Sequence, residues 1–560
     1  MNIASEHTGI PNAVKTSPIS ILHDDLLWRI FLINADLYQY DPEEPINYSV
    51  GSSFSPLRFT LYASRVSRLW RRISLDSSTI WGRVIDLDMI VGLSEEGRNE
   101  ILRRAGQSFL CIKGNGNGSV RFPRGASEEL FFSMLSTYRT RVREINVVLA
   151  LPLKEDTWRL LEMTMENLEF FSLAFRRPEW ARDETTMRET LFFGGIASKL
   201  HELRIKDAWC NLQAPWFLNI RELYLNSALP VPGVLEALNS NGLLEVLTLK
   251  NLVDSRKSSE RQVVGLPSLK QATLSNGVNA TIQILENIKA PIGCSFSITV
   301  NVPRKKHGDI TEDEAVCVYN AVSPHRRRFC TAYYPTTVHV GSRYPADDSP
   351  FFSLEDFACT TDSKPIVSAS SLSHKPSFSA KVLPGTSQFN GQWFRALFSA
   401  ATFLETYPNI TRLCLEEWLP SELTKSDLKT FASSFPNITM LQIDQYILER
   451  SPFCDTLDLF PLVHTLVLTV RYHRSDPDRF SGVISHLEMK KEGKRPITVL
   501  DLTKVHFTLK HFECWREILD GFVGLKVLFQ AEGKWHRPIT VREFICGTDQ
   551  DISAWQTLQT

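Results

Sequence analysis

The sequence predicts an α/β protein in which an N-terminal helical module precedes an irregular solenoid of parallel strands and helices. Two patterns support this prediction. Apolar residues recur at helical spacing within the first 85 residues, and from residue 140 onward the pattern L-x-x-L-x-L returns at intervals of 20 to 34 residues. A single short strand cannot bury its own leucines, so repeated strands of this kind must stack on their neighbours.

The composition is that of an ordinary soluble, folded protein. Of 560 residues, 43% are hydrophobic and 22% are charged, with a formal net charge of −1, which favours neither a nucleic-acid partner nor a membrane-surface partner. No run of about 18 apolar residues predicts a membrane span. Residues 1–17 are polar and lack the apolar core of a signal peptide, so we expect a disordered tail. The ten cysteines include no C-x-x-C pair and indicate reduced thiols in the cytoplasm or nucleus.

The N-terminal module begins with a helical pattern over residues 19–33. Leu22, Leu26, Leu27, Ile30 and Phe31 fall at helical spacing. A turn-rich stretch with three prolines follows over residues 41–56. The spacing then predicts a second helical stretch over residues 57–84, with an apolar stripe, an arginine-rich polar side and a tryptophan after a break. The residues of this stretch that we single out are Leu61, Val66, Leu69, Trp70, Ile73 and Trp81.

Periodicity alone favours a small helical bundle that packs on the rest of the chain. The order of the motifs adds a resemblance, because L-x-D-x-L-L-x-x-I-F is followed by V-S-R-x-W-R-x-I and a later tryptophan. Residues 18–85 resemble the F-box, in the divergent form found in fungal F-box (F-box-like) proteins. That resemblance implies helix-in-groove docking onto the adaptor subunit of an SCF-type ligase. The implied adaptor-binding residues are Leu22, Leu26, Leu27, Ile30, Phe31, Val66, Leu69, Trp70 and Trp81.

The strand pattern occurs in two blocks. Its copies centre on Ile145, Phe171, Leu203, Leu223, Leu247 and, more weakly, Ala272 in the first block, and on Leu413, Leu441, Leu466, Leu500 and a poorer copy at Leu528 in the second. The spacing is that of the leucine-rich repeat, with strands that alternate inward and outward side chains. Helical segments such as 234–239 and 428–435 would return the chain between strands. Residues 290–300 read as one further strand, whereas much of 300–395 is rich in serine and proline and suggests long loops with degenerate repeats.

These patterns give a domain scheme with one repeat array. We expect a tail at 1–17, a helical module at 18–85, a connecting segment at 86–139 and a repeat domain at 140–560, with a loop-rich insertion near 300–395. Looser phrases in the array also resemble the C-terminal part of fungal F-box proteins with leucine-rich repeats.

Motifs for catalysis or cofactor binding are weak. The glycine-rich run 114–118 lacks a following helix and reads as a surface turn. His506, His511 and Cys514 lack a fourth ligand nearby, so we expect no zinc site. The short basic runs, among them 326–328, read as solvated surface. We therefore expect no catalytic residue, no metal and no cofactor.

The leading hypothesis is a non-catalytic substrate-recognition subunit of an SCF-type cullin–RING E3 ubiquitin ligase, in which the repeats bind a protein substrate. The alternatives are a repeat scaffold without ligase activity and an enzyme whose site is assembled across loops. If the outward strand residues bind substrate, they include Arg204, Lys206, Tyr224 and Lys250, with Glu416, Gln442 and Asp444 further along. In the alternative arrangement, loops carry the substrate contacts.

Overall fold

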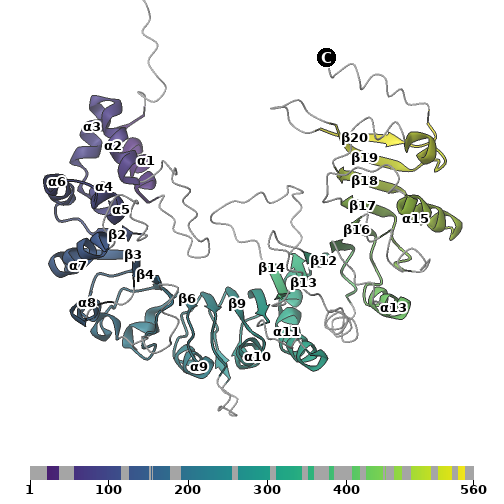
Figure 1. The fold of residues 1–560 in the computed structure, drawn as a ribbon. Helices are drawn as coiled ribbons and strands as arrows, with labels where there is room; N and C mark the ends of the chain where they lie inside the picture. The colour runs from purple at the N-terminus through teal and green to yellow at the C-terminus, as the bar shows by residue number, and fades with distance from the viewer. Residues whose placement is uncertain are drawn as a thin grey trace, which may run out of the picture. The chain divides into compact units, whose positions relative to one another are not determined.

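The computed structural model describes most of the chain. The described residues are 22–36, 56–114, 125–150, 153, 155–176, 191–254, 263–302, 311–343, 351–357, 377–383, 407–416, 424–444, 448, 459–469, 481–505, 515–531 and 540–548. The expected tail at 1–17, the expected loop at 41–55 and the histidines and cysteine of 506–514 lie outside them. The fold is mixed α/β with a large, mostly parallel sheet (Figure 1).

The chain divides into two compact units, Met1–Ile220 and Arg221–Thr560. The first unit begins with four helices, α1 (Asp24–Asp36), α2 (Pro56–Val66), α3 (Arg68–Asp76) and α4 (Ser78–Arg83). The second predicted helical stretch is thus three helices. The breaks fall at Ser67 and Ser77, whose backbones are extended, and the Ser67 side chain caps α3 by accepting a hydrogen bond from the Trp70 N–H.

The segment after this module joins the sheet rather than merely connecting two parts. It contains α5 (Leu87–Ile90), α6 (Glu95–Ala105), α7 (Ala126–Tyr138), and the strands β1 (Ile85–Asp86) and β2 (Leu110–Gly114). Parallel pairing runs from β1 to β2 and on to β3 (Val142–Ala150), β4 (Phe170–Arg176) and β5 (Glu202–Lys206). In this pairing Ile145, Phe171 and Leu203 are direct partners, and all three are fully buried.

The short helices of the first unit connect its strands. They are the α-helix α8 (Glu155–Leu161) and the 3-10 helices η2 (Arg139–Arg141), η4 (Phe192–Gly195) and η5 (Pro215–Asn219). The aromatic side chains of η4 and η5 extend the core, because Phe171 and Phe193 meet edge to face with ring centres 4.8 Å apart. Trp216 then donates a hydrogen bond from Nε1 to the Phe192 carbonyl.

The second unit repeats this arrangement over β6 (Glu222–Asn226), β7 (Val246–Lys250), β9 (Gln271–Gly277) and β11 (Ser295–Asn301). Leu223, Leu247 and Ala272 are direct partners across three parallel strands. A later series follows the second block of the pattern, over β15 (Arg412–Glu416), β16 (Met440–Asp444), β17 (Thr465–Thr469), β18 (Val499–Lys504) and β19 (Lys526–Ala531). The strands of both blocks thus fall where the leucine pattern predicts them.

Residues 300–395 contain more regular structure than the sequence predicts. A 22-residue helix, α11 (Glu312–Tyr333), begins with a capping box at Thr311. It is followed by β12 (Thr337–Arg343), β13 (Phe351–Phe357) and β14 (Ser377–Leu383). Strand β14 pairs in parallel with β11 and β12 pairs in parallel with β15, whereas β13 lies antiparallel between β12 and β14. A second antiparallel strand, β20 (Thr540–Ile545), follows β19.

Helices cover the leucine-rich face of the second unit. In Figure 1, α9 (Val231–Asn239), α10 (Val278–Asn287), α11, α13 (Lys425–Ser433) and α15 (Ser481–Glu492) lie along one side of its strands. Two strands, β8 (Val264–Gly265) and β10 (Ile288–Lys289), form a small separate parallel pair. In β7 the side chains of Leu247 and Leu249 are fully buried, while Thr248 and Lys250 between them are half-buried. The helices predicted at 234–239 and 428–435 correspond to α9 and α13.

In several turns that precede strands, a polar side chain donates a hydrogen bond to a backbone carbonyl of the preceding turn. Asn167 and Asn219 of the first unit donate to the carbonyls of Thr140 (2.8 Å) and Ser198 (3.2 Å). In the second unit, Ser268 Oγ donates to the Gly242 carbonyl and Asn437 Nδ2 to the Pro408 carbonyl, each at 2.8 Å.

One buried asparagine adds a second kind of link. Asn276 is fully buried, donates to the Leu249 carbonyl at 3.0 Å and accepts from the Leu252 N–H at 2.8 Å. It therefore satisfies backbone groups of the adjacent turn that would otherwise be buried without partners. Within the described residues, no helix is long and apolar enough to cross a membrane.

Candidate protein-docking surfaces

The N-terminal helices are held together by an aromatic core. Leu27 and Phe31 of α1 and Trp81 of α4 are each at most 3% exposed. Phe31 meets Trp70 edge to face with ring centres 5.0 Å apart, and Trp81 Nε1 donates to the Ser74 carbonyl at 2.7 Å. These contacts fix the relative positions of α1, α3 and α4.

Polar contacts tie α1 to the later helices. Trp28 Nε1 donates to Ser77 Oγ at 2.9 Å, and Arg72 pairs with Asp24 at 2.7 Å. Arg83 pairs with Asp36 at the other end of α1. Burial raises the pKa of the Asp36 carboxyl, an effect that the neighbouring Arg83 guanidinium opposes. The module is therefore fixed at both ends of α1.

The opposite side of α1 carries exposed apolar residues. Leu26, Ile30 and Ile33 are 48%, 41% and 63% exposed, and their i, i+4, i+7 spacing places them in one stripe along the helix. Leu27, Phe31 and the fully buried Ala35 lie on the core-facing side. Because α1 is apolar on both sides, its outer stripe is a candidate docking surface for an apolar partner.

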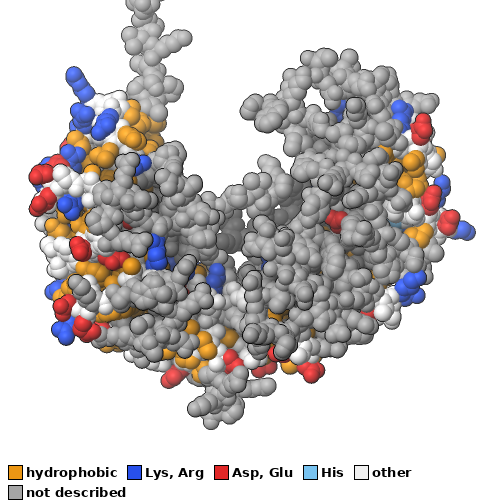
Figure 2. Space-filling view, in the orientation of Figure 1, with side chains coloured by type: hydrophobic (Ala, Val, Ile, Leu, Met, Phe, Trp, Pro, Cys, Tyr) orange, Lys and Arg blue, Asp and Glu red, His pale blue; other side chains and the backbone are white. Residues whose placement is uncertain are grey.

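Helix α2 carries a shorter stripe of the same kind. Tyr62 and Val66, one turn apart, are 61% and 62% exposed, whereas Leu57 and Ala63 are buried. Figure 2 shows hydrophobic side chains gathered on the part of the first unit that carries these helices. We call Leu26, Ile30, Ile33, Tyr62 and Val66 the apolar stripe residues.

The residues predicted to bind an adaptor separate into three groups by their exposure. Leu26, Ile30 and Val66 are exposed, and Leu22, Leu69 and Trp70 are half-buried. Leu27, Phe31 and Trp81 form the module's interior and present no surface in this conformation. Sequence reasoning missed Ile33 and Tyr62, although their helical spacing from Ile30 and Val66 is the signal that finds them.

A second candidate surface is the polar side of the strands. In the first unit, Arg204 and Lys206 of β5 are half-buried and alternate with the buried Leu203 and Ile205. Arg204 pairs with Glu202 at 2.6 Å and lies over the Phe170 ring at 5.6 Å. The side chains of Arg204 and Lys206 therefore lie on the polar side of β5, opposite the buried Leu203 and Ile205.

In the second unit, the polar side consists of two cross-strand rows. The strand register places in one row Tyr224, Thr248, Thr273, Ser297 and Ser379, and in the other Asn226, Lys250, Ser275, Thr299 and Lys381. The Lys250 ammonium lies 5.7 Å from the centre of the Tyr224 ring, which is 8% exposed. Tyr224 and Lys250 are thus brought together, but Tyr224 is buried and offers little surface, and the other residues of the two rows are mostly hydroxyl side chains.

Further along the second unit, the polar side is centred on Gln442. This side chain is 2% exposed and its Oε1 accepts from Lys504 Nζ at 2.8 Å and from Arg412 Nη2 at 3.0 Å. Asp444 is also buried, at 8% exposure. The side chain of Glu416 lies outside those described. The Gln442 side chain therefore links β16 to Arg412 of β15 and Lys504 of β18 by hydrogen bonds, and it is too buried to offer surface to a partner.

Among the described residues, no group of three or more His, Cys, Asp or Glu side chains is arranged to hold a metal ion. The basic run 326–328 is not uniformly solvated, because Arg326 is 1% exposed and lies over the Tyr407 ring at 4.2 Å.

No protein-family model matches the chain, and no curated protein matches it in sequence. The fold and surfaces define the class of protein only broadly: a mixed α/β protein with a large, mostly parallel sheet and an apolar stripe on its N-terminal helices.

Proposed function

We propose that this chain is a non-catalytic substrate-recognition subunit of an SCF-type cullin–RING E3 ubiquitin ligase, acting in the cytoplasm or nucleus. In this proposal, α1 and α2 dock onto the adaptor subunit, and the leucine-rich strands present a surface that holds a protein substrate. Ubiquitin transfer then follows from proximity, because a bound substrate is held near the ligase-bound ubiquitin carrier.

The observation that carries the proposal is the outer stripe of α1. Leu26, Ile30 and Ile33 are exposed on a helix whose other side is already packed. Full burial of an exposed apolar side chain is worth about 1.5–3 kcal/mol, and these three are about half exposed, so each contributes part of that when the helix docks in an apolar groove. The order of motifs in residues 18–85 supports the same partner.

The regular strand array supports the second half of the proposal. Parallel strands in constant register place polar residues in straight rows, such as the row from Tyr224 to Ser379. Such rows form an extended surface suited to a protein or peptide rather than to a small molecule.

The test is co-purification with the adaptor and cullin from the native source, read by mass spectrometry. The double variant Leu26→Asp/Ile30→Asp should lose both proteins, because two carboxylates cannot be desolvated in an apolar groove. The control is Arg68→Asp, which places the same side chain on the exposed first residue of α3. Circular dichroism should show that both variants keep their helices.

Retention of adaptor by the folded Leu26→Asp/Ile30→Asp variant contradicts the docking surface. If the unaltered chain captures a stable partner protein but never the adaptor or cullin, the repeat scaffold without ligase activity is the correct function.

A further inference from the structure

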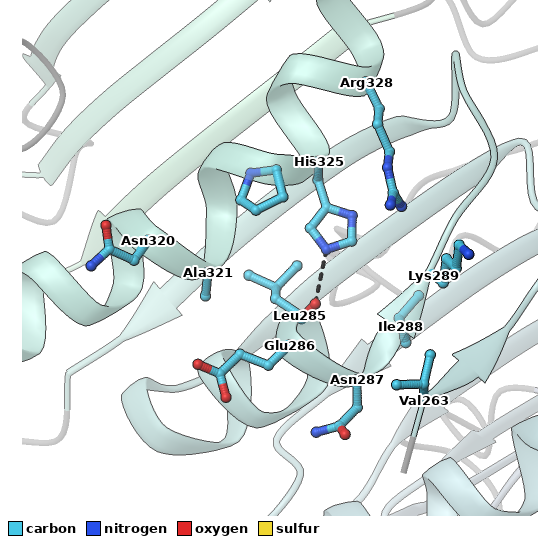
Figure 3. Close-up of a pocket in the computed structure, with 11 residues that line it drawn as sticks. Val263, Leu285, Glu286, Asn287, Ile288, Lys289, Asn320, Ala321, His325 and Arg328 are labelled. Atoms are coloured by element: carbon cyan, nitrogen blue, oxygen red, sulfur yellow. Dashed lines mark hydrogen bonds between the residues drawn. The ribbon is translucent and has the colours of Figure 1, made fainter. Parts of the chain in front are cut away.

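A pocket of about 330 Å³ lies on the helical side of the second unit, between α10, β10 and α11 (Figure 3). Its apolar wall is formed by Val263, Leu285 and Ile288. The volume is within the range of sites that hold a small ligand or the end of a peptide. No sequence motif predicts this pocket, because α10 and α11 contribute residues about 40 positions apart.

One end of the pocket is basic. Arg328 Nη1 donates to the Ala290 carbonyl at 3.2 Å, which fixes the half-buried guanidinium at the backbone of the residue after Lys289. The Lys289 side chain is exposed, and neither cation forms an ion pair with the residues that the structure describes. Figure 3 shows Arg328 and Lys289 on one side of His325, and Glu286 and Asn320 on the other.

The wall also contains two buried hydrogen-bond acceptors. His325 is 4% exposed and donates from Nε2 to the Leu285 carbonyl at 2.9 Å. Burial lowers the pKa of His325, so the ring is neutral near pH 7 and its Nδ1 is an acceptor. Asn287, 7% exposed, donates from Nδ2 to the Gln283 carbonyl. Within the described chain, His325 Nδ1 and Asn287 Oδ1 have no partner.

The charges around the pocket select a ligand with one negative charge. Lys289 and Arg328 contribute two positive charges, Glu286 contributes one negative charge, and neutral His325 contributes none. A carboxylate matches the planar guanidinium and the single excess positive charge, whereas a phosphate dianion carries one negative charge more than that excess. The two acceptors without a partner, His325 Nδ1 and Asn287 Oδ1, favour a ligand whose carboxylate is accompanied by N–H donors.

We propose that this pocket binds the carboxyl-terminal end of a protein chain. The terminal carboxylate binds Arg328 and Lys289, the last side chain packs on Leu285, Ile288 and Val263, and a backbone N–H reaches an acceptor in the wall. Capture of a C-terminal carboxylate is a recurring mode of peptide recognition, and here two cationic side chains take the place of backbone N–H donors. The inference does not depend on adaptor docking, which involves the first unit.

The experiment measures binding of N-acetyl-alanyl-leucine to the full chain by saturation-transfer NMR. The matched probe is its C-terminal amide, and N-acetyl-aspartic acid amide tests a side-chain carboxylate. Loss of a charge-assisted hydrogen bond should weaken binding of the amide by at least about tenfold. The variant Lys289→Gln/Arg328→Gln should lose binding, and Arg327→Gln, the exposed neighbour on α11, should keep it.

Thermal unfolding of the variants provides the folding control, since Arg328 also bonds to the backbone. Equal binding of acid and amide, equal loss in Arg327→Gln, or no binding by any probe overturns the proposal. Stronger binding of N-acetyl-aspartic acid amide than of N-acetyl-alanyl-leucine assigns the site to acidic side chains and also overturns it.

Discussion

At the scale of single residues, the alternation of buried and half-buried side chains along a strand determines how much a substitution lowers the free energy of unfolding. Leu247 is fully buried between helix and sheet, and Leu247→Ala should lower the free energy of unfolding by about 2–5 kcal/mol, because it leaves a cavity. Thr248→Ala, on the half-buried polar side of the same strand, should cost less than about 1 kcal/mol. Urea unfolding measures both, and equal costs would contradict the assigned strand or its facing.

A buried histidine should make stability depend on pH. Burial lowers the pKa of His486 to about 4, with the neighbouring Lys490 acting in the same direction. The unfolded chain therefore binds a proton near pH 6.5 that the folded chain does not bind until about pH 4. The stability contributed by this group is complete above pH 6.5 and is lost as pH falls toward 4.

The corresponding variant is His486→Leu, which removes the titrating ring. Between pH 7 and pH 4, the unaltered chain should lose about 3 kcal/mol more of its free energy of unfolding than the variant does. Urea unfolding at several pH values measures the difference. Parallel pH profiles for the two proteins would exclude His486 as the source, and carboxylates common to both proteins cancel in the comparison.

Residue pattern alone predicted the strands better than it predicted the surfaces. Leu203, Leu247 and Leu441 lie in buried strand positions because L-x-L alternation specifies both element and facing. The basic run 326–328 shows the limit. Arg326 is buried against Tyr407, a residue 81 positions later, and a local pattern carries no information about such a contact.

At the scale of elements, the turn side chains link neighbouring strands. Asn437 Nδ2 donates to the Pro408 carbonyl, so Asn437→Ala should lower the free energy of unfolding by about 0.5–1.5 kcal/mol. Asn409 holds the equivalent place before β15 and is exposed, and its side chain makes no hydrogen bond within the described residues. Asn409→Ala is therefore the matched control, and thermal or urea unfolding of the two variants compares them.

Equal destabilisation by Asn437→Ala and Asn409→Ala would mean that the measured cost comes from helix or turn propensity rather than from the bridging hydrogen bond.

The elements themselves were partly predictable. Helix α13 was expected near 428–435 from its apolar spacing, whereas α11 was not expected in the serine-rich stretch. Its capping box at Thr311 and Glu314 is the local signal that was available.

At the scale of the whole molecule, pattern and architecture agree in part. The sequence predicted repeated parallel strands, and the structure has a large, mostly parallel sheet. It did not predict that β1 and β2 add to the same sheet before the first leucine-rich strand, or that β13 and β20 run antiparallel. Antiparallel strands need no repeat of fixed length, so a search for regular spacing does not find them.

The long separation in sequence between the paired strands β11 and β14 has a consequence for the order in which the second unit folds. Strand β7 pairs with β6 across 24 residues, as in Glu222 with Val246, whereas β14 pairs with β11 across 82 residues, as in Ser297 with Ser379. The longer loop raises the entropic cost of closure by about 1 kcal/mol. Early zippering should therefore proceed through β6, β7 and β9 and then pause. In pulse-labelling hydrogen exchange during refolding, amides of β14 should become protected after those of β7; simultaneous protection would show that nucleation begins at the distant pair.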